Sequence, residues 1–153
     1  MATTSTTPIE DYLDIRVTDA QAEICRAVAR HKQVLAVTAN SLGKSYILAA
    51  ITLVCLLCRY PAVSFATSGT ERQMRRTYCK PVESLHKNAR VSLPGEYKSR
   101  PERIEFDNDP EHFWEATSPK DAGEFEGVHT AYTLSIIEEA DKPDTDEDVI
   151  EAM

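Results

Sequence analysis

One stretch, residues 34–57, constrains the fold of this chain more than any other. It begins with an apolar run over residues 34–37, passes through small polar residues to Gly43-Lys44-Ser45, and then enters a long apolar segment over residues 46–57. This order predicts a β-strand, a tight loop and an α-helix. A loop of this kind directs successive backbone N–H groups at one point, at the positive end of the helix dipole, and so favours an anion.

The loop fits the phosphate-loop pattern G-x-x-x-x-G-K-[ST] except at its first position, where Thr38 replaces glycine. In this interpretation Lys44 reaches the β- and γ-phosphates of a nucleotide, and the Ser45 hydroxyl holds Mg²⁺. The alternative is an ordinary helix N-terminus, with Ser41 as its cap. The predicted cofactor-binding residues of the loop are Thr38, Ala39, Asn40, Ser41, Leu42, Gly43, Lys44 and Ser45.

A second motif lies about ninety residues further on, at the spacing expected of a two-part nucleotide site. An apolar strand is predicted over residues 134–137 and delivers two adjacent carboxylates, Glu138 and Glu139. In nucleotide hydrolysis one carboxylate supports Mg²⁺ and the next polarises the attacking water, which gives the metal role to Glu138 and the catalytic base to Glu139. The alternative is a buried strand that ends in a solvated acidic loop.

The predicted fold is a three-layer α/β P-loop domain of the RecA-like ASCE type, with a mostly parallel central sheet between helices. Residues 1–14 are predicted to be a flexible lead-in, and residues 15–153 to form the domain. Within the domain, the pattern predicts helices from Thr18, over 44–58 and from Glu71, a strand over 62–66, a loop over 89–101, and a hairpin of residues 103–106 with 112–117.

The charge of the chain is unevenly distributed. Its net charge is −8, and residues 138–151 hold eight acidic residues against the single base Lys142. The chain as a whole therefore lacks the basic footprint of a nucleic-acid-binding protein. A local cluster, Arg72, Gln73, Arg75 and Arg76, is more typical of a solvated helix face than of a DNA or nucleotide contact.

No targeting or membrane segment is predicted. The Ser/Thr-rich N-terminus lacks the basic-then-apolar order of a signal peptide, and the longest apolar run, residues 47–57, is too short to cross a bilayer. The default location is the cytoplasm.

Gln21 lies in the first turn of the helix predicted from Thr18. At this position a polar residue that faces solvent is favoured over one that reads adenine.

Together these residues resemble the N-terminal ATPase domain of the terminase large subunit, the motor that packages DNA into tailed-virus proheads. Besides the two nucleotide motifs, residues 66–74 (Ala-Thr-Ser-Gly-Thr-Glu-Arg-Gln-Met) and 125–129 (Phe-Glu-Gly-Val-His) are similar to linking segments of that family. The resemblance implies ATP and Mg²⁺ as cofactors, and viral double-stranded DNA, portal protein and the small terminase subunit as partners. It also implies a homo-oligomeric ring in the host cytoplasm, and it favours Gln21 as the adenine-reading residue.

The sequence departs from the family pattern in three ways: Thr38 replaces a glycine, Asn40 and Ser41 stand where many terminases carry a loop arginine, and Glu138 replaces the usual aspartate. The family also continues into a nuclease domain, whereas this sequence stops at Met153. Two alternatives stay open: a helicase-like P-loop ATPase that acts on nucleic acid, and a truncated module that binds nucleotide without turnover.

Overall fold

The computed structural model describes residues 7–37, 43–117 and 130–138. Its helices are α1 (Thr7–Leu13), α2 (Asp19–Arg30), α3 (Lys44–Cys58), α4 (Glu71–Met74), the π-helical turn η1 (Arg75–Cys79), α5 (Lys80–Asn88) and the short 3₁₀ turn η2 (Phe106–Asn108). Its strands are β1 (Ala62–Ser68), β2 (Tyr97–Ser99), β3 (Glu102–Glu105), β4 (Phe113–Ala116) and β5 (Tyr132–Glu138).

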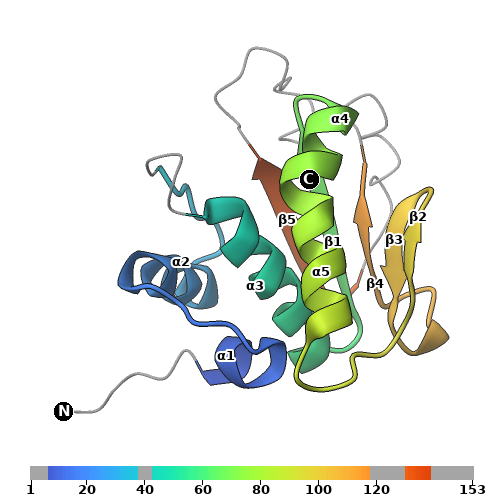
Figure 1. Ribbon diagram of the computed structural model, residues 1–153, viewed down its shortest axis with the longest axis horizontal. Coiled ribbons are helices and arrows are strands. Elements are labelled where there is room, and N and C mark those ends of the chain that lie inside the picture. The colour runs from blue at the N-terminus through green and yellow to red at the C-terminus, as the bar shows by residue number, and fades with distance from the viewer. Residues whose placement is uncertain (1–6, 38–42, 118–129, 139–153) are drawn as a thin grey trace.

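The strands form one five-stranded mixed sheet in the order β2-β3-β4-β1-β5. Strand β1 runs parallel to β4 and to β5, whereas β2–β3 and β3–β4 are antiparallel. Figure 1 shows α3 and α5 lying against one face of this sheet, with α2 beside α3 and α1 at the lower ends of α3 and α5. The parallel strands bring Ser68 and Glu138 side by side at their carboxyl ends.

The predicted RecA-like fold, a mostly parallel sheet between two helix layers, is wrong for this structure. Half of the sheet, β2–β3–β4, is antiparallel, because short connections join these strands and a short connection can only reverse the chain. The helices of the described ranges cover one face of the sheet (Figure 1), so a second helix layer is absent from this part of the chain.

The strand predicted over residues 34–37 is also absent. This segment has no regular structure, and Leu35 and Val37 are 82% and 84% exposed. A short apolar run has the composition of a buried strand, but a strand also needs a neighbour that accepts and donates its backbone hydrogen bonds. Among the described strands none pairs with it, and β5, at the edge of the sheet, pairs only with β1.

Several local predictions are confirmed. Helix α2 begins after Thr18, whose Oγ1 accepts from the Gln21 amide while the Gln21 side chain accepts from the Thr18 amide, a capping box. Helix α3 has the predicted bounds, 44–58, and Thr70 caps α4 through the Gln73 amide. The hairpin is formed by β3 and β4. The loop predicted over 89–101 contains one strand, β2, which the sequence did not indicate.

Helix α3 is the centre of the hydrophobic core. Its apolar residues are spread around most of its circumference, as expected of a helix that contacts other elements on several sides. It packs against β1 and β5 of the sheet and against α5 and α1. Helix α1 lies inside the segment predicted to be a flexible lead-in, yet its Ile9 and Leu13 are buried in this core. The fully buried residues of the core include Ile47, Leu53, Tyr78, Val82, Ile104, Phe106 and Trp114.

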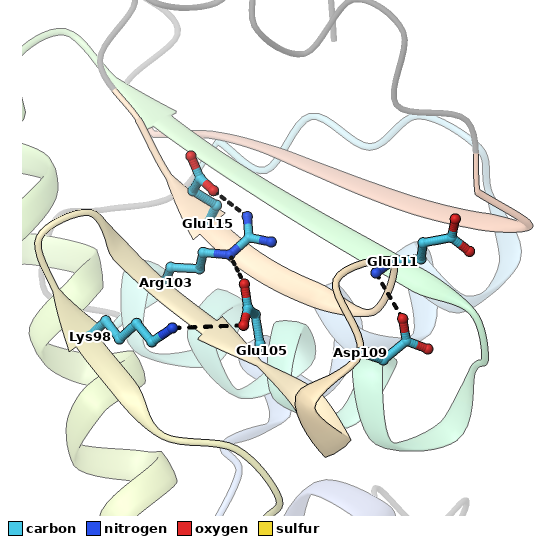
Figure 2. A network of polar contacts seen from close by, with 6 residues as sticks. All are labelled: Lys98, Arg103, Glu105, Asp109, Glu111 and Glu115. Carbon is cyan, nitrogen blue, oxygen red and sulfur yellow. Dashed lines mark hydrogen bonds and ion pairs between the residues drawn. The ribbon is translucent and has the colours of Figure 1, made fainter.

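The other face of the antiparallel strands carries a polar network instead of helices (Figure 2). Because successive strand residues alternate between faces, Arg103 and Glu115 point away from the core that holds Ile104 and Trp114. The Arg103 guanidinium bonds Glu105 (Nε to Oε1, 3.0 Å) and Glu115 and lies 3.6 Å from the centre of the Phe113 ring. The hydrogen bond from Arg103 holds the pKa of Glu105 below its usual value.

Candidate nucleotide-binding site

The two predicted metal-binding residues, Ser45 and Glu138, are in direct contact. Ser45 is the second residue of α3, and Glu138 is the last residue of β5. The Ser45 Oγ donates a hydrogen bond of 2.8 Å to Glu138 Oε2, although 93 residues separate them in the chain. The Glu138 side chain is buried, with the residue only 8% exposed. A hydroxyl and a carboxylate therefore meet where a helix begins and a parallel strand ends.

The backbone ahead of Ser45 suits an anion. Gly43 is the N-cap of α3 and has a left-handed conformation, φ +67° and ψ +39°, which glycine adopts without steric cost. It supplies no side-chain cap, and the first helical hydrogen bond is that of the Ile47 amide to the Gly43 carbonyl. The amides before Ile47 thus have no carbonyl partner inside the helix, and they lie at the positive end of a fifteen-residue helix dipole.

Lys44 is the first residue of α3 and is half-buried, next to Ser45 and one position after Gly43. The structure thus brings three of the predicted residues, Lys44, Ser45 and Glu138, to the same end of α3. The remaining loop residues, Thr38, Ala39, Asn40, Ser41 and Leu42, lie outside the described residues, and so does the predicted base, Glu139.

Gln21 also lies beside this helix end. Its Nε2 donates to the Gly43 carbonyl at 3.5 Å, the long limit of a hydrogen bond, and its Oε1 accepts from the Thr18 amide. The same Nε2 is 3.1 Å from the position that a Cβ on Gly43 would take. Any larger residue at position 43 would therefore press on Gln21 as well as strain the backbone. These contacts give Gln21 a structural role that ties α2 to α3, and its adenine-reading role stays a prediction.

Sequence reasoning missed a buried hydroxyl pair further along α3. The Thr52 hydroxyl and the Tyr78 hydroxyl are 2.5 Å apart, and both residues are fully buried. Thr52 lies two helical turns after Ser45, and Tyr78 comes from the π turn η1. Burial raises the pKa of Tyr78 far above that of an ordinary phenol, and the negative charge of Glu138 adds to the rise. The one available signal was a threonine within an otherwise apolar helix.

Replacing Tyr78 with phenylalanine should lower the free energy of unfolding by about 1–3 kcal/mol, because the buried Thr52 hydroxyl loses its partner. Urea denaturation followed by circular dichroism measures this change. The matched control is Tyr60→Phe, which removes an exposed hydrogen bond of 2.7 Å to Asp109 and should cost less than about 0.5 kcal/mol. Equal costs for the two variants would show that the buried pair has no special stabilising role.

The oxygen donors of this site fit Mg²⁺. This ion prefers hard oxygen ligands and is commonly held by one or two carboxylates together with phosphate oxygens and water. Glu138 and Ser45 supply a carboxylate and a hydroxyl of that kind. The described ranges contain no group of three or more His, Cys, Asp or Glu side chains that could hold a metal by themselves. A bound Mg²⁺ would accordingly need ligands from phosphate and water as well.

Comparison with known proteins identified no relative: no family model, no curated protein and no solved structure matched this chain. In the part of the chain that the structure describes, no helix is long and apolar enough to cross a membrane.

Proposed function

We propose that this chain binds Mg²⁺-ATP at the N-terminus of α3 and hydrolyses it as the motor domain of a viral DNA-packaging machine. The observation that carries the nucleotide site is the 2.8 Å contact between Ser45 Oγ and Glu138 Oε2. A serine after Gly-Lys and an acidic residue at a strand end are the pair that a phosphate loop needs for Mg²⁺. The packaging role rests on the sequence resemblance to terminases.

In this proposal each residue has a distinct task. The backbone amides at the start of α3 and the Lys44 ammonium hold the phosphates, and Ser45 and Glu138 hold Mg²⁺, which neutralises charge on the phosphate oxygens. Glu139, directly after β5, accepts a proton from the attacking water. The burial of Glu138 strengthens its attraction for a cation, since charges interact more strongly where water is excluded.

The proposal is tested by the affinity of the whole chain for ATP, measured by isothermal titration calorimetry with and without Mg²⁺. Wild-type protein should bind ATP more tightly with Mg²⁺. Glu138→Gln keeps the shape of the side chain but removes its charge, and it should reduce the gain from Mg²⁺ by roughly tenfold, about 1.4 kcal/mol. The matched control is Glu102→Gln, which neutralises a similarly buried carboxylate on β3 and should leave the gain unchanged.

A folded wild-type protein that binds no Mg²⁺-ATP would refute the nucleotide site. An equal effect of Glu102→Gln and Glu138→Gln would refute the role of Glu138. Turnover then separates the proposed ATPase from a module that only binds, because the latter holds Mg²⁺-ATP without releasing phosphate.

A further inference from the structure

The continuous helical segment 71–88, formed by α4, η1 and α5, has a charge opposite to that of the chain. It carries five basic residues against two acidic ones, within a protein whose net charge is −8. One side of it is buried in the core through Met74, Tyr78, Val82 and Leu85. The other side faces away from the sheet (Figure 1). Three basic residues of the segment, Arg72, Arg76 and Lys80, are exposed. We refer to these three residues as the basic stripe.

Intramolecular ion pairs already occupy the other charges of this segment. Arg75 lies 3.8 Å from Glu71 and 2.8 Å from Glu102, and Lys87 lies 2.7 Å from Glu83. Both acidic residues of the segment, Glu71 and Glu83, thus form ion pairs with residues outside the basic stripe. No member of the stripe forms an ion pair with another residue of the described ranges. Arg75 therefore differs from the stripe: it forms ion pairs within the protein, whereas the three cations of the stripe are exposed to solvent.

The spacing of the stripe aligns its charges. Its members are four residues apart, so they follow one another along one side of the helix at intervals of about 6 Å. The π turn at Arg75–Cys79 closes its hydrogen bonds five residues apart, which brings a four-residue step closer to a full turn. The three cations of the stripe repel one another, and an anion bound along them would offset this repulsion.

We propose that the basic stripe binds the phosphate backbone of double-stranded DNA, without reading its sequence. This inference rests on the proposed function, for which DNA is the cargo. Two of its three members are arginines, whose planar guanidinium groups bind phosphate oxygens in pairs. A row of phosphates, each with one negative charge, matches a row of exposed cations better than a single small anion does. A local row of cations also lets a chain that is acidic overall approach DNA.

The test measures how salt weakens the binding of the whole chain to a short fluorescent duplex, by fluorescence anisotropy. Each phosphate contact contributes about −0.9 to the slope of log K against log salt concentration. The triple variant Arg72→Ala, Arg76→Ala, Lys80→Ala should therefore make this negative slope shallower by about 2.7 relative to the wild type. The matched control, Arg16→Ala, Arg30→Ala, Lys32→Ala, removes three other exposed charges that also form no ion pair within the described ranges. Its slope should equal that of the wild type.

Equal slopes for the wild type and the stripe variant would overturn the inference, as would equal losses in the stripe and control variants, which would indicate a general charge effect. A wild-type protein that binds a labelled poly-glutamate peptide but not the duplex would also overturn it, in favour of an acidic protein partner. Mg²⁺-ATP affinity is measured on the same samples. A wild-type protein that binds Mg²⁺-ATP but not the duplex refutes only the stripe, and one that binds the duplex but not Mg²⁺-ATP refutes only the nucleotide site.

Discussion

Replacing Lys44 with alanine is expected to weaken binding of Mg²⁺-ATP by roughly 10- to 150-fold. In the proposed site the ammonium makes charge-assisted hydrogen bonds to phosphate oxygens, and such bonds contribute about 1.5–3 kcal/mol each. Turnover should fall further, by about another hundredfold, because the negative charge that Lys44 stabilises increases in the transition state. Calorimetry gives the affinity, and a phosphate-release assay gives the rate.

Lys32→Ala is the control for this experiment. Lys32 is an exposed lysine between α2 and the apolar segment 34–37, so its loss changes the net charge equally but removes no group from the end of α3. Its affinity for Mg²⁺-ATP should match that of the wild type. Unchanged affinity in Lys44→Ala, with the circular dichroism spectrum of the wild type, would mean that the loop before α3 does not hold phosphates.

The contact between Ser45 and Glu138 does not require the mostly parallel, two-sided sheet that the sequence predicted. A mostly parallel, two-sided sheet was predicted, and the sheet is mixed, with described helices on one face. Yet the parallel pair β1–β5 ends at Glu138, and α3 begins at Lys44, so the carboxyl end of one strand and the amino end of one helix meet. The 2.8 Å contact depends only on that meeting. Its two residues were assigned to one metal site from two motifs, without any statement about the order of the strands in the sheet.

Local features of the fold were predictable because their causes are local. Thr18 and Thr70 cap helices through bonds to amides three residues away, and the bounds of α3 follow from Gly43 and from the end of the apolar run. Strand direction is different, since it depends on which strands become neighbours, and this is a property of the whole chain. Strand β2 was missed for another reason. Its three residues pair with β3 across a connection of two residues, but they lie in a stretch whose proline and glycine residues indicate a loop.

Within the site, sequence reasoning found the residues that motifs name and missed those that only packing joins. Ser45 and Glu138 belong to recognised patterns, so their contact could be expected. Thr52 and Tyr78 belong to none, and the π turn that directs Tyr78 towards α3 has no sequence signature. Arg75 was grouped with Arg72 and Arg76 in the sequence, but its partner Glu102 lies on a strand that only the fold brings near.

Leu53→Ala is expected to lower the free energy of unfolding by about 2–5 kcal/mol. Leu53 is completely buried in α3, at the centre of the core, and truncation there loses buried apolar surface and leaves a cavity. Urea denaturation followed by circular dichroism measures the change, with a slope equal to that of the wild type if only stability is altered.

The same substitution at Leu35 distinguishes the observed fold from the predicted one. Leu35 lies in the segment that the apolar pattern assigned to a buried strand, but it is 82% exposed. In the observed fold Leu35→Ala removes almost no buried surface, so its cost should be below about 0.5 kcal/mol. In the predicted fold its side chain would fill the core, and the cost would approach that of Leu53→Ala. Equal costs at the two positions would therefore contradict the exposed placement of residues 34–37 and favour a sheet that includes them.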